Sequence, residues 1–289
     1  MVHIIKDVQG ALGTFVTVTV IHPDISEGIS AVRAAFDAVH RIHHLMNVHE
    51  QNSEVGALNR EGYYEEVSDD TRHVIQRANY FSELFEGAFD ITVLPLLKLW
   101  EENVSKDKIP TDPEISERLK LVDYRNIFIE GRNIRFRKRG MGITLAGVAK
   151  GYAVDKAIEA IARCNIEHAL VNAGGDIRAI GEKDKSIPWR IAIRDPRNKN
   201  RIVTTLELCD QAIATSGTYR RSFSDILNPK GGRPAQGVLS STVIAKTAMD
   251  ADMLATCMFV LGAEKGIELI GKLDGVKAFI IGNDGSFPN

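Results

Sequence analysis

The stretch His168-Ala-Leu-Val-Asn-Ala-Gly-Gly-Asp-Ile-Arg-Ala-Ile180 holds two short apolar segments separated by a pair of glycines. Residues 168–172 and 177–180 have the length and composition of strands, and the link between them is too short for a crossover helix. We therefore expect the two strands to pair antiparallel. Gly174 and Gly175 form a turn here, or else allow a ligand to approach the backbone closely.

The rest of the chain repeats this pattern and adds helices to it. Further strand candidates occupy residues 13–21, 133–136, 141–145, 190–193 and 203–208, and most of the strand candidates are joined by short turns. Apolar residues at helical spacing predict a long helix that ends near residue 46 and a second helix near 69–86. Further helices are expected near 148–163 and 248–261. The pattern predicts an α+β fold of two lobes, with helices packed on largely antiparallel or mixed sheets. Residues 1–289 are expected to form one domain, with a lobe boundary in the polar segment 103–117.

The composition is that of a globular protein and excludes several classes. The chain has 289 residues, of which 44% are hydrophobic and 26% charged. Its formal net charge of −2 provides no basic field for nucleic acid, so we expect no nucleic-acid partner. No apolar run approaches the roughly 20 residues of a transmembrane helix. The three cysteines form no CxxC pair, which argues against a disulfide framework and a cysteine-rich metal site.

Asp252 and Thr256 are four residues apart in a predicted helix, so their side chains lie on the same face. A carboxylate and a hydroxyl, completed by carbonyls, waters or phosphate oxygens, suit Mg²⁺. The same spacing also arises by chance. Thr247 and Asp250 nearby read as a helix-capping pair with no metal role.

The segment Thr144-Leu-Ala-Gly-Val-Ala-Lys-Gly-Tyr152 leads from a predicted strand into a helix. Gly147 and Lys150 stand where free backbone N–H groups and a cation can meet an anion such as phosphate. The spacing of a Walker loop is missing, and small residues that pack a helix onto a sheet give the same pattern. His40 and His44 have the spacing of zinc ligands, although imidazoles are also favoured at a helix end by the helix dipole.

Seven segments, in order, resemble the motifs of the FAD:protein FMN transferase family, the ApbE-type flavin transferases. They are Leu12-Gly-Thr14, Ser53-Glu54 with Leu58-Asn59, Gly87-Ala-Phe-Asp-Ile-Thr92 with Pro95, Ala149-Lys-Gly-Tyr-Ala-Val-Asp155, Gly174-Gly-Asp176, Ala214-Thr-Ser-Gly217, and Ala251-Asp252 with Ala255-Thr256. The likeness spans nearly the whole chain. It implies an enzyme that binds FAD and Mg²⁺, breaks the pyrophosphate and joins FMN to a threonine of an acceptor flavoprotein, with release of AMP.

The resemblance also assigns roles to individual residues. Asp252, Thr256 and the backbone carbonyl of Gly147 match the metal ligands, and Asp252 and Asp225 match residues of the transfer step. The positions that match FAD contacts are Leu12, His49, Ala88, Phe89, Asp90, Thr144, Lys150, Gly175, Asp176 and Ile226.

The chain departs from the family pattern at three of these positions. Asp225 stands where the family has a histidine implicated in transfer, Thr144 replaces an aspartate, and His49 replaces a tyrosine. Asp225 is therefore expected to supply the acid or base chemistry itself. The departures leave two alternatives: a protein that binds FAD without efficient transfer, and an FAD pyrophosphatase that gives FMN and AMP.

The resemblance implies an acceptor with a Gly-Ala-Thr-type motif, in a subunit of a membrane redox complex. The amino-terminal residues contain no basic segment followed by an apolar leader. The chain as written is therefore expected in the cytoplasm. Export and membrane anchoring, which the family implies, require a leader removed from this sequence.

Overall fold

A computed structural model describes residues 2–217 and 226–283 of the chain. Its largest element is a seven-stranded sheet, made of β1 (His3–Ala11), β2 (Thr14–His22), β6 (Ala169–Ala173), β7 (Asp176–Ile180), β10 (Ala212–Gly217), β11 (Val238–Ala245) and β12 (Lys277–Gly282). The strands lie side by side in that order, and each pairs antiparallel with its neighbour. The pairing of Asn172 with Ile177 confirms the antiparallel hairpin expected around the two glycines.

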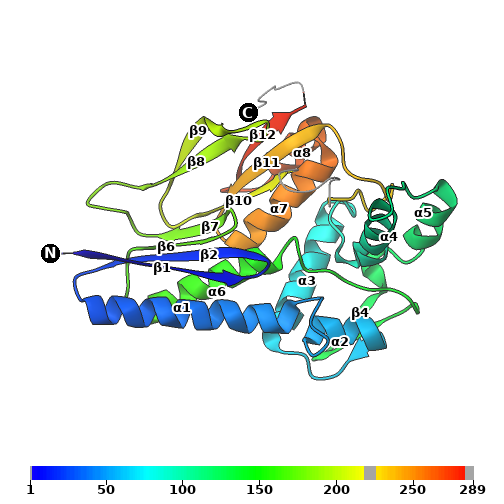
Figure 1. The fold of residues 1–289 in the computed structure, drawn as a ribbon, viewed down its shortest axis with the longest axis horizontal. Helices are drawn as coiled ribbons and strands as arrows, with labels where there is room; N and C mark the ends of the chain where they lie inside the picture. The colour runs from blue at the N-terminus through cyan, green and yellow to red at the C-terminus, as the bar shows by residue number, and fades with distance from the viewer. Residues whose placement is uncertain (1, 218–225, 284–289) are drawn as a thin grey trace.

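Helices cover one face of this sheet and a β-ribbon covers part of the other (Figure 1). The helices are α1 (Ile25–Met46), α6 (Ala149–Arg163), α7 (Ala248–Leu261) and α8 (Ala263–Ile270). Val16, Val18 and Val20 alternate along β2 and pack against α1 and α6. The ribbon of β8 (Trp189–Asp195) and β9 (Asn198–Leu208) buries Trp189 and Leu208 against the opposite face.

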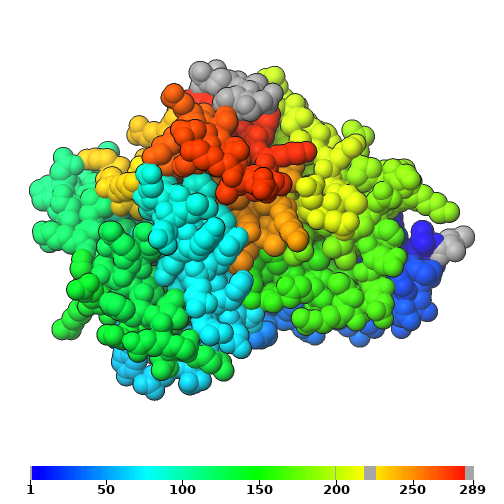
Figure 2. Space-filling view, turned by 180° about the vertical axis from the view of Figure 1, so that it is seen from behind, coloured from blue at the N-terminus to red at the C-terminus, as the bar shows by residue number. Residues whose placement is uncertain are grey.

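The remaining elements gather at one end of the molecule (Figure 1). They are α2 (Glu54–Glu61), α3 (Asp69–Leu84), η1 (Ile91–Val93), α4 (Leu94–Val104), α5 (Asp112–Leu119), η2 (Tyr124–Asn126) and a small sheet of β3 (Tyr63–Tyr64), β5 (Asn133–Phe136) and β4 (Ile127–Glu130). From behind, α3 in cyan lies against the orange carboxy-terminal helices (Figure 2). One apolar cluster includes Ile75 of α3, Met253 of α7 and Ile280 of β12, so this end shares a core with the large sheet.

The α+β class with antiparallel sheets is confirmed, and so are the four helices expected near 25–46, 69–86, 148–163 and 248–261. The lobe boundary near 103–117 stays a prediction. This segment runs from the end of α4 into α5, whose Ile115 packs with Leu99 and Trp100. Thr111 and Glu114 form a capping box that starts α5, a signal available in the sequence. None of the helices in the described ranges is both long and apolar enough to cross a bilayer.

The strand expected at residues 141–145 does not form. Both backbone groups of Ile143 bind one side chain: its N–H donates to Asn59 Oδ1 at 2.7 Å, and Asn59 Nδ2 donates to its carbonyl at 2.8 Å. The Thr144 N–H donates to the carbonyl of Ile91. Because these groups are satisfied outside a ladder, the apolar segment packs without strand pairing.

The helices α6 and α7 cross in close contact at Gly151. A Cβ atom on Gly151 would lie 2.3 Å from the carbonyl oxygen of Ala248. Four residues further along α6, the buried carboxylate of Asp155 accepts hydrogen bonds from the N–H groups of Ala248 and Met249, each at 2.9 Å. Arg178 of β7 donates to the same carboxylate at 2.7 Å. Asp155 thus satisfies two free N–H groups at the start of α7 and fixes that helix on α6.

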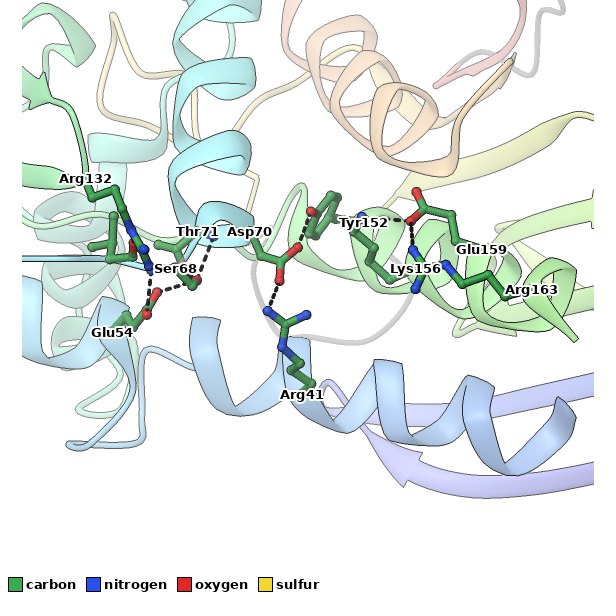
Figure 3. A network of polar contacts seen from close by, with 11 residues as sticks. Arg41, Glu54, Ser68, Asp70, Thr71, Arg132, Tyr152, Lys156, Glu159 and Arg163 are labelled. Carbon is green, nitrogen blue, oxygen red and sulfur yellow. Dashed lines mark hydrogen bonds and ion pairs between the residues drawn. The ribbon is translucent and has the colours of Figure 1, made fainter. Parts of the chain in front are cut away.

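A second polar cluster joins α1, α3 and α6 (Figure 3). The Tyr152 hydroxyl donates to Asp70 Oδ1 at 2.6 Å, and the Arg41 guanidinium contacts Asp70 Oδ2 at 2.5 Å. Burial, followed by the hydrogen bond to Asp70, raises the pKa of the Tyr152 hydroxyl above its ordinary value. The phenol therefore stays a hydrogen-bond donor and holds the start of α3 against α6.

We expect Gly151→Ala to lower the free energy of unfolding by about 2–3 kcal/mol, because the new methyl group forces α6 and α7 apart. Urea denaturation measures this change. Gly10→Ala is the matched control, since no atom lies within 4 Å of a Cβ added at Gly10 and its unfolding free energy should stay near that of the parent protein. Equal stabilities of the two variants would contradict the close crossing.

Candidate active site

A cavity of about 660 Å³ opens where the sheet, α1, α6 and α7 meet the helices of the other end. Its walls come from segments far apart in the sequence: the β1–β2 turn, the end of α1, residues 88–93, residues 144–150, the β6–β7 turn, the end of β10, residues 226–229 and one face of α7. The volume is in the range of sites for cofactor-sized ligands.

The floor of the cavity is built from three charged side chains. The Lys150 ammonium lies 2.6 Å from Asp176 Oδ2 and 3.3 Å from Asp252 Oδ2. Both carboxylate side chains are almost fully buried, at 4% and 5% exposed, whereas the Lys150 side chain is 29% exposed. The Gly151 N–H also donates to Asp252 Oδ2, at 3.4 Å. The fold thus brings together two acidic residues and one cation from α6, β7 and α7.

This arrangement changes the proton affinities of its members. Burial alone lowers the pKa of Lys150, but Asp176 and then Asp252 outweigh it and raise the pKa above its ordinary value. Burial, and next the charge of Asp176, raise the pKa of Asp252 to about 7, against the opposing effect of Lys150. The floor therefore carries a firmly protonated lysine beside a carboxyl group that exchanges its proton near neutrality.

Thr256 lies one helical turn beyond Asp252 on the same face of α7. Its hydroxyl donates to the Asp252 carbonyl at 3.2 Å and lies 3.1 Å from the Ser216 hydroxyl at the end of β10. A Cβ atom on Gly147 would lie 3.4 Å from the Thr256 hydroxyl and 3.2 Å from the Phe89 ring, so the Gly147 backbone is close to both. The three residues nominated as metal ligands are therefore neighbours in the cavity.

The oxygen atoms of Asp252, Thr256 and Gly147 suit Mg²⁺ better than a metal ion whose ligands all come from protein side chains. Within residues 2–217 and 226–283, no three His, Cys, Asp or Glu side chains gather in a way that could hold a metal. Mg²⁺ prefers oxygen ligands, usually keeps several waters, and is commonly bound through one or two carboxylates plus substrate phosphates. One buried carboxylate, one hydroxyl and an adjacent backbone segment are consistent with that coordination preference.

The cavity is also lined by apolar side chains, together with hydroxyl, amide and imidazole groups. Leu12, Phe89 and Ile226 are among the apolar ones, with Ile42, Met46 and Leu97. Leu12 has a positive φ of 55° and is followed by Gly13 at 69°, which gives the tight turn between β1 and β2. A leucine in this conformation is uncommon, and its N–H donates to His43 Nδ1 at 3.3 Å. The His43 side chain, at the end of α1, thus helps to hold the turn at the cavity wall.

Asp90 lies at the cavity edge but is occupied by local hydrogen bonds. Its carboxylate accepts from the N–H and the hydroxyl of Thr92 and from the N–H of Tyr124. Burial raises the pKa of Asp90, and the hydrogen bonds from Thr92 and Tyr124 oppose the rise. Asp90 therefore connects the start of η1 to η2 and shapes the wall that carries Phe89.

The described residues that the resemblance assigns to FAD or to the metal line this cavity with one exception. Leu12, His49, Ala88, Phe89, Asp90, Thr144, Gly147, Lys150, Asp176, Ile226, Asp252 and Thr256 are all at its surface. Gly175 is not among the lining residues, and its N–H donates a hydrogen bond to Asn172 Oδ1 at 2.9 Å, which makes it part of the turn. Asp225 lies outside the described residues.

Several lining residues were not nominated from the sequence. Ser216 was quoted within a motif but given no role, and its contact with Thr256 appears only in the fold. His43, Met46 and Asn47 reach the cavity from the end of α1. The apolar spacing that includes Met46 indicated only a core-facing helix, and His43 drew notice only as a neighbour of His40 and His44. The signal that could have found them is their proximity in sequence to His49.

The sheet, the covering helices and a cavity lined by apolar side chains and by the cluster of Lys150, Asp176 and Asp252 define an α+β protein with room for a cofactor-sized ligand. Residues 12–280 match the model of the ApbE family, and the chain belongs to that family.

Known proteins of the family resemble this chain along most of its length. The FAD:protein FMN transferase of Vibrio cholerae is 36% identical over 235 residues, which cover 77% of this chain and 70% of that protein. The FAD:protein FMN transferase of Haemophilus influenzae is 31% identical, over 84% of this chain and 75% of its own length. The crystal structure of the ApbE protein from Thermotoga maritima superposes with a TM-score of 0.91 at 33% identity, covering 99% of this chain and 97% of that one. The flavin transferase ApbE from Vibrio cholerae gives a TM-score of 0.89 at 30% identity, over 100% and 96%.

The raised pKa of Asp252 predicts a pH-dependent stability. Between an unfolded pKa of 3.8 and a folded value of about 7, the folded protein retains a proton that the unfolded chain has released, so the free energy of unfolding falls as pH rises through that window. Asp252→Asn cannot titrate. From pH 5.5 to 7.0 we expect the parent protein to lose about 2 kcal/mol relative to this variant in urea denaturation with EDTA present.

Asp250→Asn is the control. It removes another carboxylate of α7, one that pairs with Arg77 and not with Lys150. Its stability should follow the parent curve across this range. Parallel curves for the parent and Asp252→Asn would show that Asp252 does not titrate near neutrality.

Proposed function

We propose that this chain transfers FMN from FAD to a threonine hydroxyl of an acceptor protein, with release of AMP and dependence on Mg²⁺. Membership of the ApbE family and relatives named FAD:protein FMN transferase support flavin transfer from FAD. The observation that carries the proposal is the cavity, in which the residues matching the family's motifs come together as apolar walls over a charged floor.

The two parts of the cavity suit the two parts of FAD. The apolar wall with Leu12, Phe89 and Ile226 can enclose the flavin ring, which has an extended aromatic face. The pyrophosphate would then face Lys150, at the start of α6. An ammonium group is a usual partner of phosphate oxygens.

In the proposed reaction the acceptor oxygen forms a bond to the FMN phosphorus as the bond from that phosphorus to the AMP oxygen breaks. AMP leaves, and the hydroxyl proton passes to a base. We assign that base to Asp225 from its match to the family's histidine position. The described chain resumes at Ile226, which lines the cavity.

Asp252, Thr256 and the Gly147 carbonyl are the residues that would hold Mg²⁺. When bound, Mg²⁺ supplies neutralisation of the charge that develops on the phosphate oxygens. Lys150 provides a positive charge beside the same carboxylate, and the side chains of Asp176 and Asp252 are themselves buried. The acceptor is proposed to be a flavoprotein with a Gly-Ala-Thr-type motif, in a membrane redox complex.

The test mixes the protein with FAD, Mg²⁺ and an acceptor domain that carries such a threonine, and weighs the acceptor by intact mass spectrometry. We expect a gain of one FMN that disappears with EDTA. A protein that binds FAD but produces neither a modified acceptor nor AMP would be a flavin-binding protein. Free FMN and AMP without acceptor modification would identify a pyrophosphatase.

Asp252→Ala should reduce Mg²⁺-dependent transfer by at least 100-fold, because it removes the only carboxylate among the proposed metal ligands. The initial rate of acceptor modification is the measurement. Asp250→Asn should retain the parent rate, since Asp250 pairs with Arg77 and does not line the cavity. Full activity of Asp252→Ala would count against the metal assignment.

A further inference from the structure

The Lys150 ammonium contacts the carboxylate that we assign to the metal. It lies 3.3 Å from Asp252 Oδ2, on the side of the cavity floor where α6 and α7 cross. A divalent cation bound to Asp252 therefore has a positive charge next to it from the start. The ammonium and the bound cation would repel each other strongly in this buried site, because solvent screens buried charges poorly.

Lys150 has a second partner that would keep it neutralised if it left Asp252. Asp176 Oδ2 lies closer to the ammonium, at 2.6 Å, and its side chain is only 4% exposed. The lysine head is a compact charge on a flexible stem, so a small rotation can move it from one carboxylate to the other or toward the cavity. Part of the side chain already faces the cavity, which it lines.

We propose that Lys150 competes with the divalent cation for Asp252, and that an anionic substrate relieves this competition by drawing the ammonium toward itself. The metal site is thereby made to depend on the substrate. The identity of that anion as the pyrophosphate of FAD rests on the proposed function, whereas the competition between Lys150 and the cation does not.

This competition gives a direct expectation for metal affinity without any substrate. Lys150→Met removes the charge but keeps an unbranched side chain of similar length. Mn²⁺ is the probe, and free Mn²⁺ is measured by electron paramagnetic resonance at pH 8 with no FAD and no acceptor present. We expect Lys150→Met to bind Mn²⁺ at least tenfold more tightly than the parent protein.

Two control variants test whether the change in Mn²⁺ affinity comes from the charge of residue 150, and a third variant is held in reserve. Lys150→Arg keeps the positive charge and should bind Mn²⁺ within threefold of the parent. Lys156→Met removes a cation from the same helix that pairs with Glu159 at 2.8 Å, and should leave the Mn²⁺ affinity unchanged. Lys150→Gln, a polar neutral variant, replaces Lys150→Met if the latter does not fold, with the same expected tightening.

A neutral variant that folds and binds Mn²⁺ no better than the parent would overturn the proposal. So would tightening of equal size in Lys156→Met, which would indicate a general effect of charge. Since these titrations contain no FAD, they can succeed even if flavin transfer fails.

The dependence on substrate is tested by adding saturating FAD to the Mn²⁺ titration. Direct contacts between Mn²⁺ and the FAD phosphates are common to all variants, so the difference between proteins isolates Lys150. FAD should tighten Mn²⁺ binding at least fivefold more in the parent than in Lys150→Met. Equal tightening in both proteins would contradict the coupling through Lys150, and a parent protein that binds no FAD would instead contradict the proposed function.

Discussion

The close crossing of α6 and α7 is the constraint on which the charged floor of the cavity depends. Gly151 allows the α6 backbone to reach the carbonyl of Ala248, and Asp155 then holds the first N–H groups of α7. Lys150 immediately precedes the crossing on α6, and Asp252 follows it by one turn on α7. The same contact that joins the helices therefore sets the distance between the ammonium and the carboxylate.

That geometry gives the cavity an unusual balance of charge. Two buried carboxylates share one ammonium, and burial of an unpaired charge is costly, so the floor favours a further cation while Lys150 resists it. The apolar wall meets this floor directly, since Phe89 and Thr256 both lie against Gly147. A ligand with an aromatic ring attached to phosphates could place the ring against Phe89 and the phosphates at this floor once a further cation offsets the two carboxylates, which links the proposed flavin transfer to the behaviour proposed for Lys150.

The elements that form this site differ in how far their sequences reveal them. The helices α1 and α3 carry apolar residues at helical spacing, and β2 alternates valines with polar residues, so local periodicity was enough to predict them. α7 is buried on nearly all sides and shows no such periodicity. The same reasoning was wrong for residues 141–145. Their apolar pattern is that of a strand, but the side chain of Asn59 takes both backbone groups of Ile143 and no ladder forms.

The sequence by itself determined the α+β class and the antiparallel hairpin at Gly174 and Gly175, and it nominated part of the cavity lining, including Lys150, Asp176 and Asp252. Each of these rests on spacing within a short segment or on the order of motifs along the chain. Only the tertiary structure decided that Lys150 contacts both Asp176 and Asp252, and that Ser216 reaches Thr256. These partners come from different elements, and the packing of α6, α7 and the sheet, which no local pattern specifies, sets the distances between them.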